Sequence, residues 1–475
     1  MIGLFGMLNM ASQSLNTQMT GVDVTGQNLA NVNTTGYQRQ TVDIETNPDI
    51  ATGFGPEGTG AGVASIQQIS DALLNSQVQS QQSVSGYWNS QQSALQSAQT
   101  NLDEYLNGTA SSSSSSANDT TSTGLSAQLS GLFSDFSSLA TTPTSVAAQQ
   151  AVVNQAQNLA TTFNQVNSQL DQLNTSLNSS VTTGVSSANE LLSNIASLNG
   201  EINSAEADGG TANSLLDTRD QDLANLSQLV NIQTSTSTGT GSAVNISIGG
   251  QTLVSGAQSL DQLQAYDPGN GQLQVKTANG GVPLTLTGGS IQGTIDARDG
   301  TLATLQSNVN TLASTLITQV NGIESPGYSP TGTTGTAFFT GTGASDIAVN
   351  STLVNNPALL QSSASASSPS DNSVALQLAD LSSTTQSDLN GQTFSASYDA
   401  TVASLGNALQ TANDQVTNQT AVATMLQTQQ SDVSGVNIDQ EMTNLMGFQR
   451  AYEASAQLVT TINEMMQTVN NMKTG

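Results

Sequence analysis

The densest groups of charged side chains in the sequence are two short clusters that mix acidic and basic residues. The first comprises Asp217, Arg219, Asp220 and Asp222, and the second comprises Asp296, Arg298 and Asp299. A pair of carboxylates could act as general acid and base or bind a divalent cation. On a helix, however, acids three residues apart beside an arginine more often make structural ion pairs, here Asp217 and Asp220 with Arg219. We therefore predict structural roles for both clusters, with Asp299 capping a helix that begins near Thr301.

A glycine-rich segment at residues 53–58 matches the GxGxxG pattern of phosphate-binding loops. That pattern binds phosphate when its backbone amides face the ligand at the start of a helix. Here Pro56 has no amide hydrogen, and Glu57 adds a negative charge. We interpret the segment as a glycine-rich turn.

The sequence contains neither cysteine nor histidine. This composition excludes disulfides, cysteine–histidine nucleophiles, serine–histidine–aspartate triads and His/Cys zinc sites within the chain. We expect no catalytic, cofactor-binding or metal-binding residues.

The charge balance is strongly acidic, with 34 acidic residues, 6 basic residues and a net charge of −28. Nucleic acids and anionic membranes attract basic surfaces, so we expect neither as a partner. Charged residues nevertheless make up 8% of the chain, so most of the surface must carry neutral polar side chains, as in secreted or surface-exposed polymers. The sequence shows no run of 18 apolar residues and no Sec-type signal peptide, so export would need another route.

Both ends of the chain carry apolar residues at the spacing of amphipathic helices. The predicted assembly residues are Leu8, Leu15, Met19, Val22, Leu29, Ile438, Leu445, Phe448, Tyr452, Val459, Ile462, Met466 and Val469. Each stripe needs a partner surface, which could be the core of the same chain or another molecule. Because terminal helices without a fixed neighbour are usually poorly ordered, we expect these ends to become ordered on assembly.

The interior alternates between helical and β-like stretches. Residues 152–177 carry an apolar seam with steps of four and three, which predicts one long helix. Residues 231–298 combine alternating apolar positions with glycine turns, and residues 325–370 form a second loop-and-strand stretch. A serine-rich stretch at residues 108–124 is typical of a mobile loop.

These patterns predict a mainly α fold with a β insertion, that is, a multi-domain α+β protein. The predicted domains are paired terminal helices at residues 1–35 and 436–475, a long-helix bundle at residues 36–230, 299–324 and 371–435, and a protruding β-rich outer region at residues 231–298 and 325–370. We expect the β-rich region to lie at the far end of the long helices.

Two terminal segments resemble the signatures of bacterial flagellar axial proteins, which are the rod, hook and hook-associated families. The N-terminal match is Asn28-Leu29-Ala30-Asn31-Val32-Asn33-Thr34-Thr35-Gly36-Tyr37. Its motif residues are Asn28, Ala30, Asn31, Gly36 and Tyr37. The C-terminal match begins with Val436-Asn437-Ile438-Asp439-Gln440-Glu441 and continues to Ala456.

Interior segments resemble one of these families, hook-associated protein 1 (FlgK). The matching segments are residues 215–230, 293–299, 335–339 and 347–350, with the helical stretch 163–177. The serine-rich stretch at residues 108–124 departs from the family pattern.

The resemblance implies a structural, non-enzymatic protein at the junction between the flagellar hook and the filament. In that family the terminal helices surround an export channel, the long-helix domain forms the next shell, and the β-rich domain faces outward. Subunits would stack head to tail through heterologous contacts. The implied partners are further copies of the chain, the hook protein, a second junction protein or the filament protein, and an export chaperone at the C-terminal region. Flagellar type III export would place the chain outside the cell.

Two alternatives remain open at this point. Another axial component, such as a hook or distal-rod protein, would share the terminal signatures, but the long helix at residues 152–177 favours the hook-associated family. An extracellular carboxylate-dependent hydrolase would need two convergent acids in an aromatic-lined cleft. One Trp, seven Tyr and nine Phe in 475 residues make such a cleft a poor fit.

Overall fold

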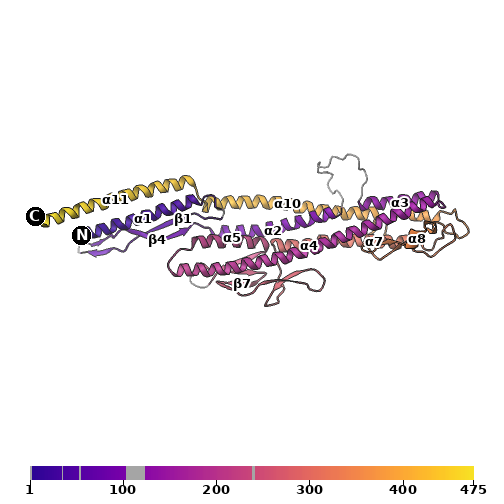
Figure 1. The fold of residues 1–475 in the computed structure, drawn as a ribbon, viewed down its shortest axis with the longest axis horizontal. Coiled ribbons are helices and arrows are strands. Elements are labelled where there is room, and N and C mark those ends of the chain that lie inside the picture. The colour runs from indigo at the N-terminus through magenta and orange to yellow at the C-terminus, as the bar shows by residue number, and fades with distance from the viewer. Residues whose placement is uncertain (1–2, 35, 53–54, 103–123, 238–240, 475) are drawn as a thin grey trace.

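The molecule is elongated, and both ends of the chain lie at the same end of it (Figure 1). The structure is a computed structural model that describes residues 3–34, 36–52, 55–102, 124–237 and 241–474. The predicted serine-rich loop, except Gly124, and the first two residues of the glycine-rich turn lie outside these residues. Within the described residues, no helix is both long and apolar enough to cross a membrane.

The terminal part consists of two long helices and a β-hairpin. Its elements are α1 (Leu4–Ala30), α11 (Ile438–Thr474), β1 (Gln40–Thr46), β2 (Ile50–Thr52), β3 (Gly55–Glu57) and β4 (Ala61–Gln68). Antiparallel β1 and β4 pack along α1, and α11 packs along α1 as well. We predicted residues 36–68 in the long-helix domain, but the structure places them with the terminal helices because the hairpin packs on α1.

The body of the molecule is a bundle of long helices. Its elements are α2 (Ala72–Asn101), α4 (Val146–Ala207), α5 (Asn213–Leu229), α6 (Gly289–Asp296), the π-helical turn η1 (Ala297–Leu302), α7 (Ala303–Glu324) and α10 (Phe394–Ser434). Helix α4 has 62 residues, so it is about 93 Å long at about 1.5 Å per residue. All eight apolar positions predicted in the seam at residues 152–177 are buried, which confirms that seam.

The tip of the molecule lies opposite the chain ends. Its elements are α3 (Leu125–Thr141), β11 (Phe339–Thr340), β12 (Ala348–Val349), α8 (Ser351–Asn355), η2 (Pro357–Leu359), α9 (Ser373–Asp380) and η3 (Ser387–Leu389). These elements share one apolar core with the first half of α4, α7 and α10. We predicted no separate helix at residues 125–141, although Leu125, Leu129 and Leu132 are spaced for one and are fully buried.

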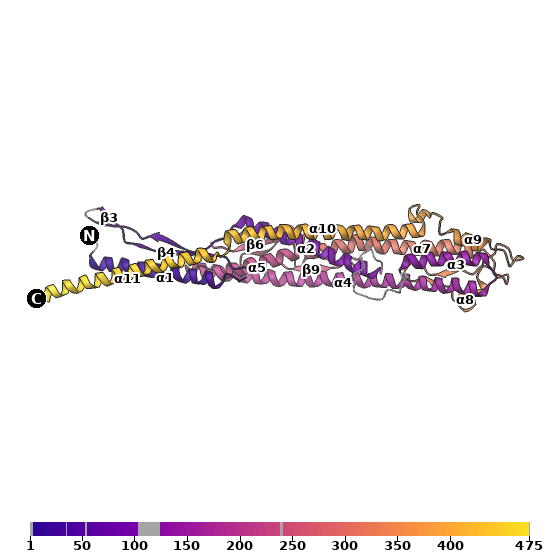
Figure 2. The same ribbon diagram turned by 90° about the horizontal axis from the view of Figure 1, so that it is seen from above.

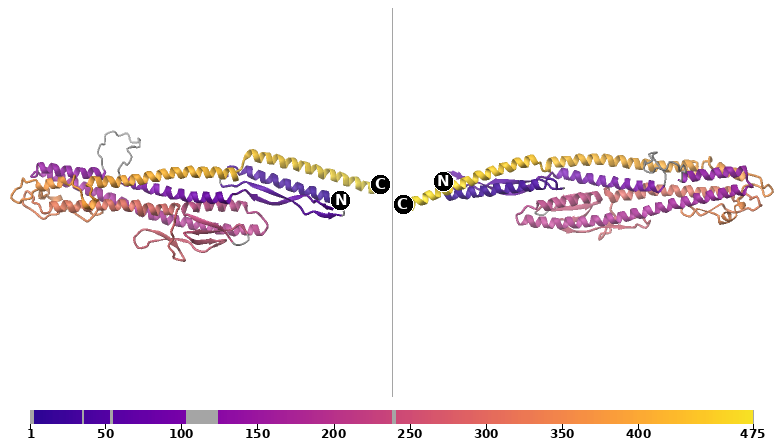
Figure 3. Two further views of the ribbon diagram at one scale, coloured as in Figure 1. Left: turned by 180° about the vertical axis from the view of Figure 1, so that it is seen from behind. Right: turned by 45° about the horizontal axis from the view of Figure 1, so that its top comes forward.

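A side sheet covers the second half of α4. Strands β5 (Ile232–Thr236), β6 (Val244–Ile248), β7 (Gln251–Ser255) and β8 (Gln258–Ser259) form an antiparallel sheet in that order. Strands β9 (Leu263–Tyr266) and β10 (Gln274–Thr277) form a separate hairpin. Together with α4, α5 and α6 they enclose a second apolar core. Figures 2 and 3 show that this sheet lies beside α4 and α5, not at the end of the body.

Two expectations about the β-rich outer region are therefore corrected. Residues 231–277 pack in the second core, whereas residues 325–370 pack in the first core at the tip, so they do not form one region. Residues 289–298 are helical and pack against α2 and α4 within the body. The fold class is confirmed, since the chain is mainly helical with long terminal helices and inserted strands.

Three glycines let helices α2, α5 and α6 cross at backbone contact. A Cβ atom on Gly86 would lie 2.1 Å from the Gln228 carbonyl oxygen, and one on Gly293 would lie 2.2 Å from the Tyr87 carbonyl oxygen. Gly289 also has a positive φ of 82°, a conformation that glycine adopts without steric cost. Gly289 was predicted as a turn residue, but at all three positions the small size of glycine is what the crossing requires.

We predict that Gly293→Ala destabilises the body, because the new methyl group must displace the backbone of α2. The expected loss in the free energy of unfolding is about 2–3 kcal/mol, measured by chemical denaturation. Gly322→Ala is the matched control, since Gly322 is an exposed glycine of α7 with no atom within 4 Å of the new methyl position. That control should be neutral or stabilising by up to about 1 kcal/mol. Equal effects of the two substitutions would contradict the crossing.

Candidate assembly site

The two terminal helices meet within one chain. The Phe448 ring lies against Gly21, where a Cβ atom would come within 2.6 Å of two ring carbons. The Ser14 and Ser455 hydroxyl oxygens are 2.9 Å apart and share a hydrogen bond. Helix α1 itself therefore offers a first partner for α11, and the prediction that the ends become fully ordered only on assembly stays a prediction.

The thirteen predicted assembly residues fall into three groups. Ile462 is fully buried in the seam between α1 and α11. The half-buried residues are Leu8, Leu15, Val22, Leu29, Leu445, Phe448, Val459 and Met466. The exposed residues are Met19, Ile438, Tyr452 and Val469. Some of the predicted assembly residues therefore close the seam between α1 and α11, and others face outward.

A buried ion pair closes the seam at its inner end. The Glu441 side chain, 2% exposed, accepts a hydrogen bond from Arg39 Nε at 2.7 Å. Its other oxygen accepts one from Asn28 Nδ2 at 3.0 Å. A buried carboxylate is tolerated only when it is paired and hydrogen-bonded. This ion pair therefore fixes the position of α11 on α1.

Asn28 has every hydrogen-bonding position of its amide occupied. Its Nδ2 donates to Glu441 and, at 2.8 Å, to the Gln40 carbonyl oxygen. Its Oδ1 accepts from the Tyr37 hydroxyl at 2.8 Å and from the Gln40 backbone N–H at 2.9 Å. Burial, with Asp217 and Glu441 nearby, raises the pKa of Tyr37 to about 12, so the phenol keeps the proton that it donates. Asn28 and Tyr37 thus join α1, β1 and α11 through one side-chain amide.

The backbone of Arg39 joins the terminal part to the body. Its N–H donates to the Ser434 carbonyl oxygen of α10 at 2.8 Å, and its carbonyl oxygen accepts from the Ile69 N–H at 2.8 Å. Gly36, with a φ of 82°, supplies the turn that leads into this segment. Asn31 ends α1, and its side chain accepts a hydrogen bond from Thr34. Ala30 is exposed, and nothing in the structure explains why the motif has alanine at this position.

The acidic residues of α5, Asp217 and Asp220, accept hydrogen bonds from the segment at residues 36–39 and from Gln68. Gln38 donates through its side chain to Asp220 at 3.2 Å, and Gln68 donates to Asp217. Burial and the charge of Asp220 raise the pKa of Asp217 to about 7, although hydrogen bonds from Gln38 and Gln68 act in the opposite direction. Burial also raises the pKa of Asp220. We call the contact of residues 36–39 with Asp217 and Asp220 the acidic joint.

Arg219 does not pair with its neighbours as we predicted. It is buried on another side of α5, where its Nη1 donates to Asn199 Oδ1 at 3.2 Å and to the Ser242 carbonyl oxygen at 2.5 Å. It therefore fastens α5 to α4 and to the side sheet. The cluster divides into an arginine that faces the sheet and two acids that face the terminal part.

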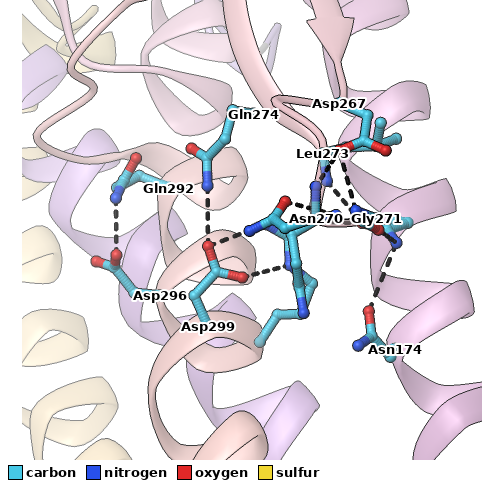
Figure 4. A network of polar contacts seen from close by, with 12 residues as sticks. Asn174, Asp267, Asn270, Gly271, Leu273, Gln274, Gln292, Asp296 and Asp299 are labelled. Carbon is cyan, nitrogen blue, oxygen red and sulfur yellow. Dashed lines mark hydrogen bonds and ion pairs between the residues drawn. The ribbon is translucent and has the colours of Figure 1, made fainter.

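The second cluster holds the body together at η1 (Figure 4). Arg298 is fully buried and donates to both carboxylate oxygens of Asp299, at 2.7 and 3.1 Å, and to Asn178 of α4 at 2.6 Å. Asp299 also accepts from Gln274 of β10 at 2.9 Å. Asp296 accepts from the Tyr87 hydroxyl at 2.9 Å. Asp299 lies inside a π-helical turn, so the prediction that it caps a new helix was wrong.

Two cavities, each of about 560 Å³, lie along the body. One is lined by serines, other neutral polar residues and apolar residues of α2, α4, α5 and α6, and no carboxylate occurs among its described lining residues. The other lies at the acidic joint and has amide side chains, Tyr37 and one carboxylate, Asp220, among its described lining residues. Neither cavity presents the two convergent acids that a glycosidase-type hydrolase needs.

The sequence does not reveal the residues that hold the segment at residues 36–39 in place. Arg39 is one of six basic residues, Glu441 lies within the C-terminal motif, and no pattern distinguishes Gln38. One signal was available: in a chain with so few basic residues, an arginine beside a family motif is a candidate partner for a buried acid.

Three family models, which match both ends and the interior of the chain, identify it as a flagellar axial protein. Residues 110–339 match the model of the flagellar hook-associated protein FlgK helical domain. Residues 8–38 match the flagella basal body rod protein model, and residues 430–472 match the C-terminal model of the FlgEFG rod proteins.

The chain belongs to the flagellar hook-associated protein 1 (FlgK) family. It is 26% identical to flagellar hook-associated protein 1 of Bacillus subtilis, with 99% of each chain covered. It is 24% identical to the Escherichia coli protein of the same name, with 98% of this chain and all of that protein covered. The solved structure of the flagellar hook junction protein FlgK from Burkholderia pseudomallei has the same fold, with a TM-score of 0.63, 18% identity, and 76% of this chain and all of that chain covered.

We predict that Glu441→Ala loosens α11 from α1, because Arg39 loses its partner and Asn28 loses an acceptor. The free energy that holds α11 on α1 should fall by about 2–3 kcal/mol. Limited trypsin digestion with mass spectrometry should detect faster cleavage after Arg450, an exposed residue of α11. Glu453→Ala, an exposed position on the same helix, is the control. Equal cleavage rates for the two variants would contradict the role of the ion pair.

We predict that Asp217→Asn stabilises the chain increasingly as pH rises. Because the pKa of Asp217 is raised from 3.8 to about 7, the folded form holds a proton that the unfolded form releases between about pH 4 and 7. The free energy of unfolding of the original chain should therefore fall through that window. Above pH 7, the free energy of unfolding of the variant should exceed that of the original chain by about 1–2 kcal/mol. Asp399→Asn, exposed on α10, controls for net charge. A gain that does not change with pH would overturn this prediction.

Proposed function

We propose that this chain is a structural adaptor between the flagellar hook and the filament, and that it assembles through the outward faces of α1 and α11. One observation carries the proposal: among its described residues, α11 buries just Glu441 and Ile462. Its exposed apolar residues are Ile438, Met442, Met446, Tyr452, Leu458, Met465, Val469 and Met472. A 37-residue helix with so little of its apolar surface covered needs further neighbours.

The exposed residues of α11 form two stripes. Ile438, Met442 and Met446 are four residues apart, whereas Leu458, Met465 and Met472 are seven apart. At about 3.6 residues per turn, the two stripes point in different directions. One α11 can therefore contact different neighbours on its two sides, as a heterologous helical assembly requires.

The proposed arrangement places the terminal part innermost, around an export channel, with the body as the next shell and the side sheet facing outward. The proposed partners are further copies of the chain, the hook protein, and a second junction protein or the filament protein. A chaperone would cover the C-terminal region before export through the flagellar type III apparatus. The chain would have no enzymatic activity and would act in the extracellular part of the flagellum.

The name of the solved relative, a flagellar hook junction protein, supports a position next to the hook. A hook or rod component is the alternative, since rod-protein models match both ends of the chain. The interior match to the FlgK helical domain favours the junction protein.

We predict that Val469→Asp prevents assembly and leaves the monomer folded, because Val469 is 56% exposed and its neighbours would lie on other subunits. In cells that lack the original gene, filament attachment should fall at least tenfold, a change of about 1.4 kcal/mol in the contact. Electron microscopy of hooks and motility assays measure this loss.

Val282→Asp is the matched control, because Val282 is a 40% exposed valine beside β10, far from the terminal helices in the sequence. It should leave attachment unchanged. Normal filaments with Val469→Asp, or equal loss with Val282→Asp, would contradict the proposal.

A further inference from the structure

Asparagine followed by glycine is the sequence at which a backbone most readily attacks its own side chain. The glycine nitrogen loses its proton and bonds to the asparagine Cγ, ammonia leaves, and water then opens the succinimide ring to aspartate or isoaspartate. Glycine permits this step because it has no side chain to obstruct ring closure. The group that binds the glycine N–H therefore decides whether such a pair reacts.

Six Asn–Gly pairs occur in the sequence, and the structure describes all of them except the first. They begin at Asn107, Asn199, Asn270, Asn279, Asn321 and Asn390. Gly200 and Gly322 lie inside α4 and α7, where a helical N–H bonds to the carbonyl oxygen four residues earlier. The Gly391 N–H donates to the Gln386 carbonyl oxygen at 2.9 Å. These three pairs are therefore held by the main chain.

In the turn between β9 and β10, a carboxylate holds the reactive nitrogen instead. Asp267 Oδ1 accepts hydrogen bonds from the N–H groups of Asn270 and Gly271, each at 3.0 Å (Figure 4). It also accepts one from the Gly269 N–H at 2.7 Å, which is the main reason that the pKa of Asp267 lies below its usual value. The ionised carboxylate stabilises the proton on the Gly271 nitrogen and so opposes its removal.

Asp261 has the same role in the turn that follows β10. Its Oδ2 accepts from the Gly280 N–H at 3.0 Å, and its Oδ1 accepts from the Asn279 N–H at 2.8 Å. Backbone hydrogen bonds, that from Asn279 foremost, lower the pKa of Asp261. Asn270 and Asn279 are both exposed, so water can reach their side chains. Each exposed pair thus depends on one aspartate.

The turn at Asn270 also fastens the β9–β10 hairpin to the body. Asn178 of α4 donates to the Gly271 carbonyl oxygen at 3.0 Å and accepts from the Leu273 N–H at 3.1 Å. The same Asn178 oxygen accepts from Arg298 at 2.6 Å. Isoaspartate adds one atom to the backbone, so at position 270 it would shift Gly271 relative to Leu273. The turn could then no longer make both bonds to Asn178.

We propose that Asn270 and Asn279 are latent deamidation sites that the carboxylates of Asp267 and Asp261 keep closed, and that deamidation at Asn270 releases the β9–β10 hairpin from α4. The inference goes beyond the proposed function, because every step takes place within one chain.

The test follows deamidation of the full-length chain during storage at neutral pH by mass spectrometry. Trypsin cleaves after Lys276, which places the two sites on different peptides. Asp267→Ala should raise the deamidation rate at Asn270 by a factor of about ten or more and leave the rate at Asn279 unchanged. Asp261→Ala should do the reverse, so each variant is the matched control for the other. An unchanged rate at the site beside the substituted aspartate would overturn the proposal.

Deamidation at Asn321 checks the fold of each variant, because that pair lies in α7 and needs no carboxylate. Equal acceleration at Asn321 and Asn270 in Asp267→Ala would show general unfolding and would also overturn the proposal. Hydrogen exchange tests the release of the hairpin. Within the aged Asp267→Ala sample, the Leu273 amide should exchange faster in molecules deamidated at Asn270 than in unmodified ones. Equal exchange in the two would contradict the release.

Discussion

The carboxylate of Glu441 is the group on which the terminal part depends. It is buried in a chain with six basic residues, and one of these, Arg39, lies against it at 2.7 Å. Arg39 and Glu441 are 402 positions apart in the sequence, so forming this contact closes a loop that includes most of the chain. A buried carboxylate left without its partner costs several kcal/mol, so α11 has one favourable position on α1. The seam of Phe448 on Gly21 and the buried Ile462 follow from that position.

The segment at residues 36–39, which carries Arg39, also connects the terminal part to the body. Residues 36–39 lie between Glu441 on one side and the acids of α5 on the other, and the Arg39 backbone bonds to the end of α10. The body can hold this joint in place because its helices cross at backbone contact through Gly86 and Gly293 and because Arg298 ties η1 to α4. The proposed assembly surfaces and the two packed cores thus occupy different parts of the chain.

Local periodicity was enough to predict the long helices and the fold class. The seam at residues 152–177 steps by four and three because one face of α4 is buried, and such a pattern is visible without knowing the partner. Polar partners were not predictable in this way. Nothing near Arg219 in the sequence shows that it bonds to Asn199 and Ser242 instead of the adjacent acids. The two β-like stretches looked alike in composition, but the distant helices against which each packs place them in different cores. Gly289 was interpreted as part of a turn because a close helix crossing and a turn both require glycine.

Hydrogen exchange of backbone amides, compared between the monomer and the chain assembled on hooks, tests the central claim most directly. The account places α11 on α1 through the ion pair and leaves its outer faces open. In the monomer, amides near Glu441 should therefore exchange slowly, and those at residues 455–472 should exchange faster. On assembly the outer residues should become strongly protected, while the second core beside the side sheet should change little. Full protection of residues 455–472 in the monomer, or none gained on assembly, would contradict the account.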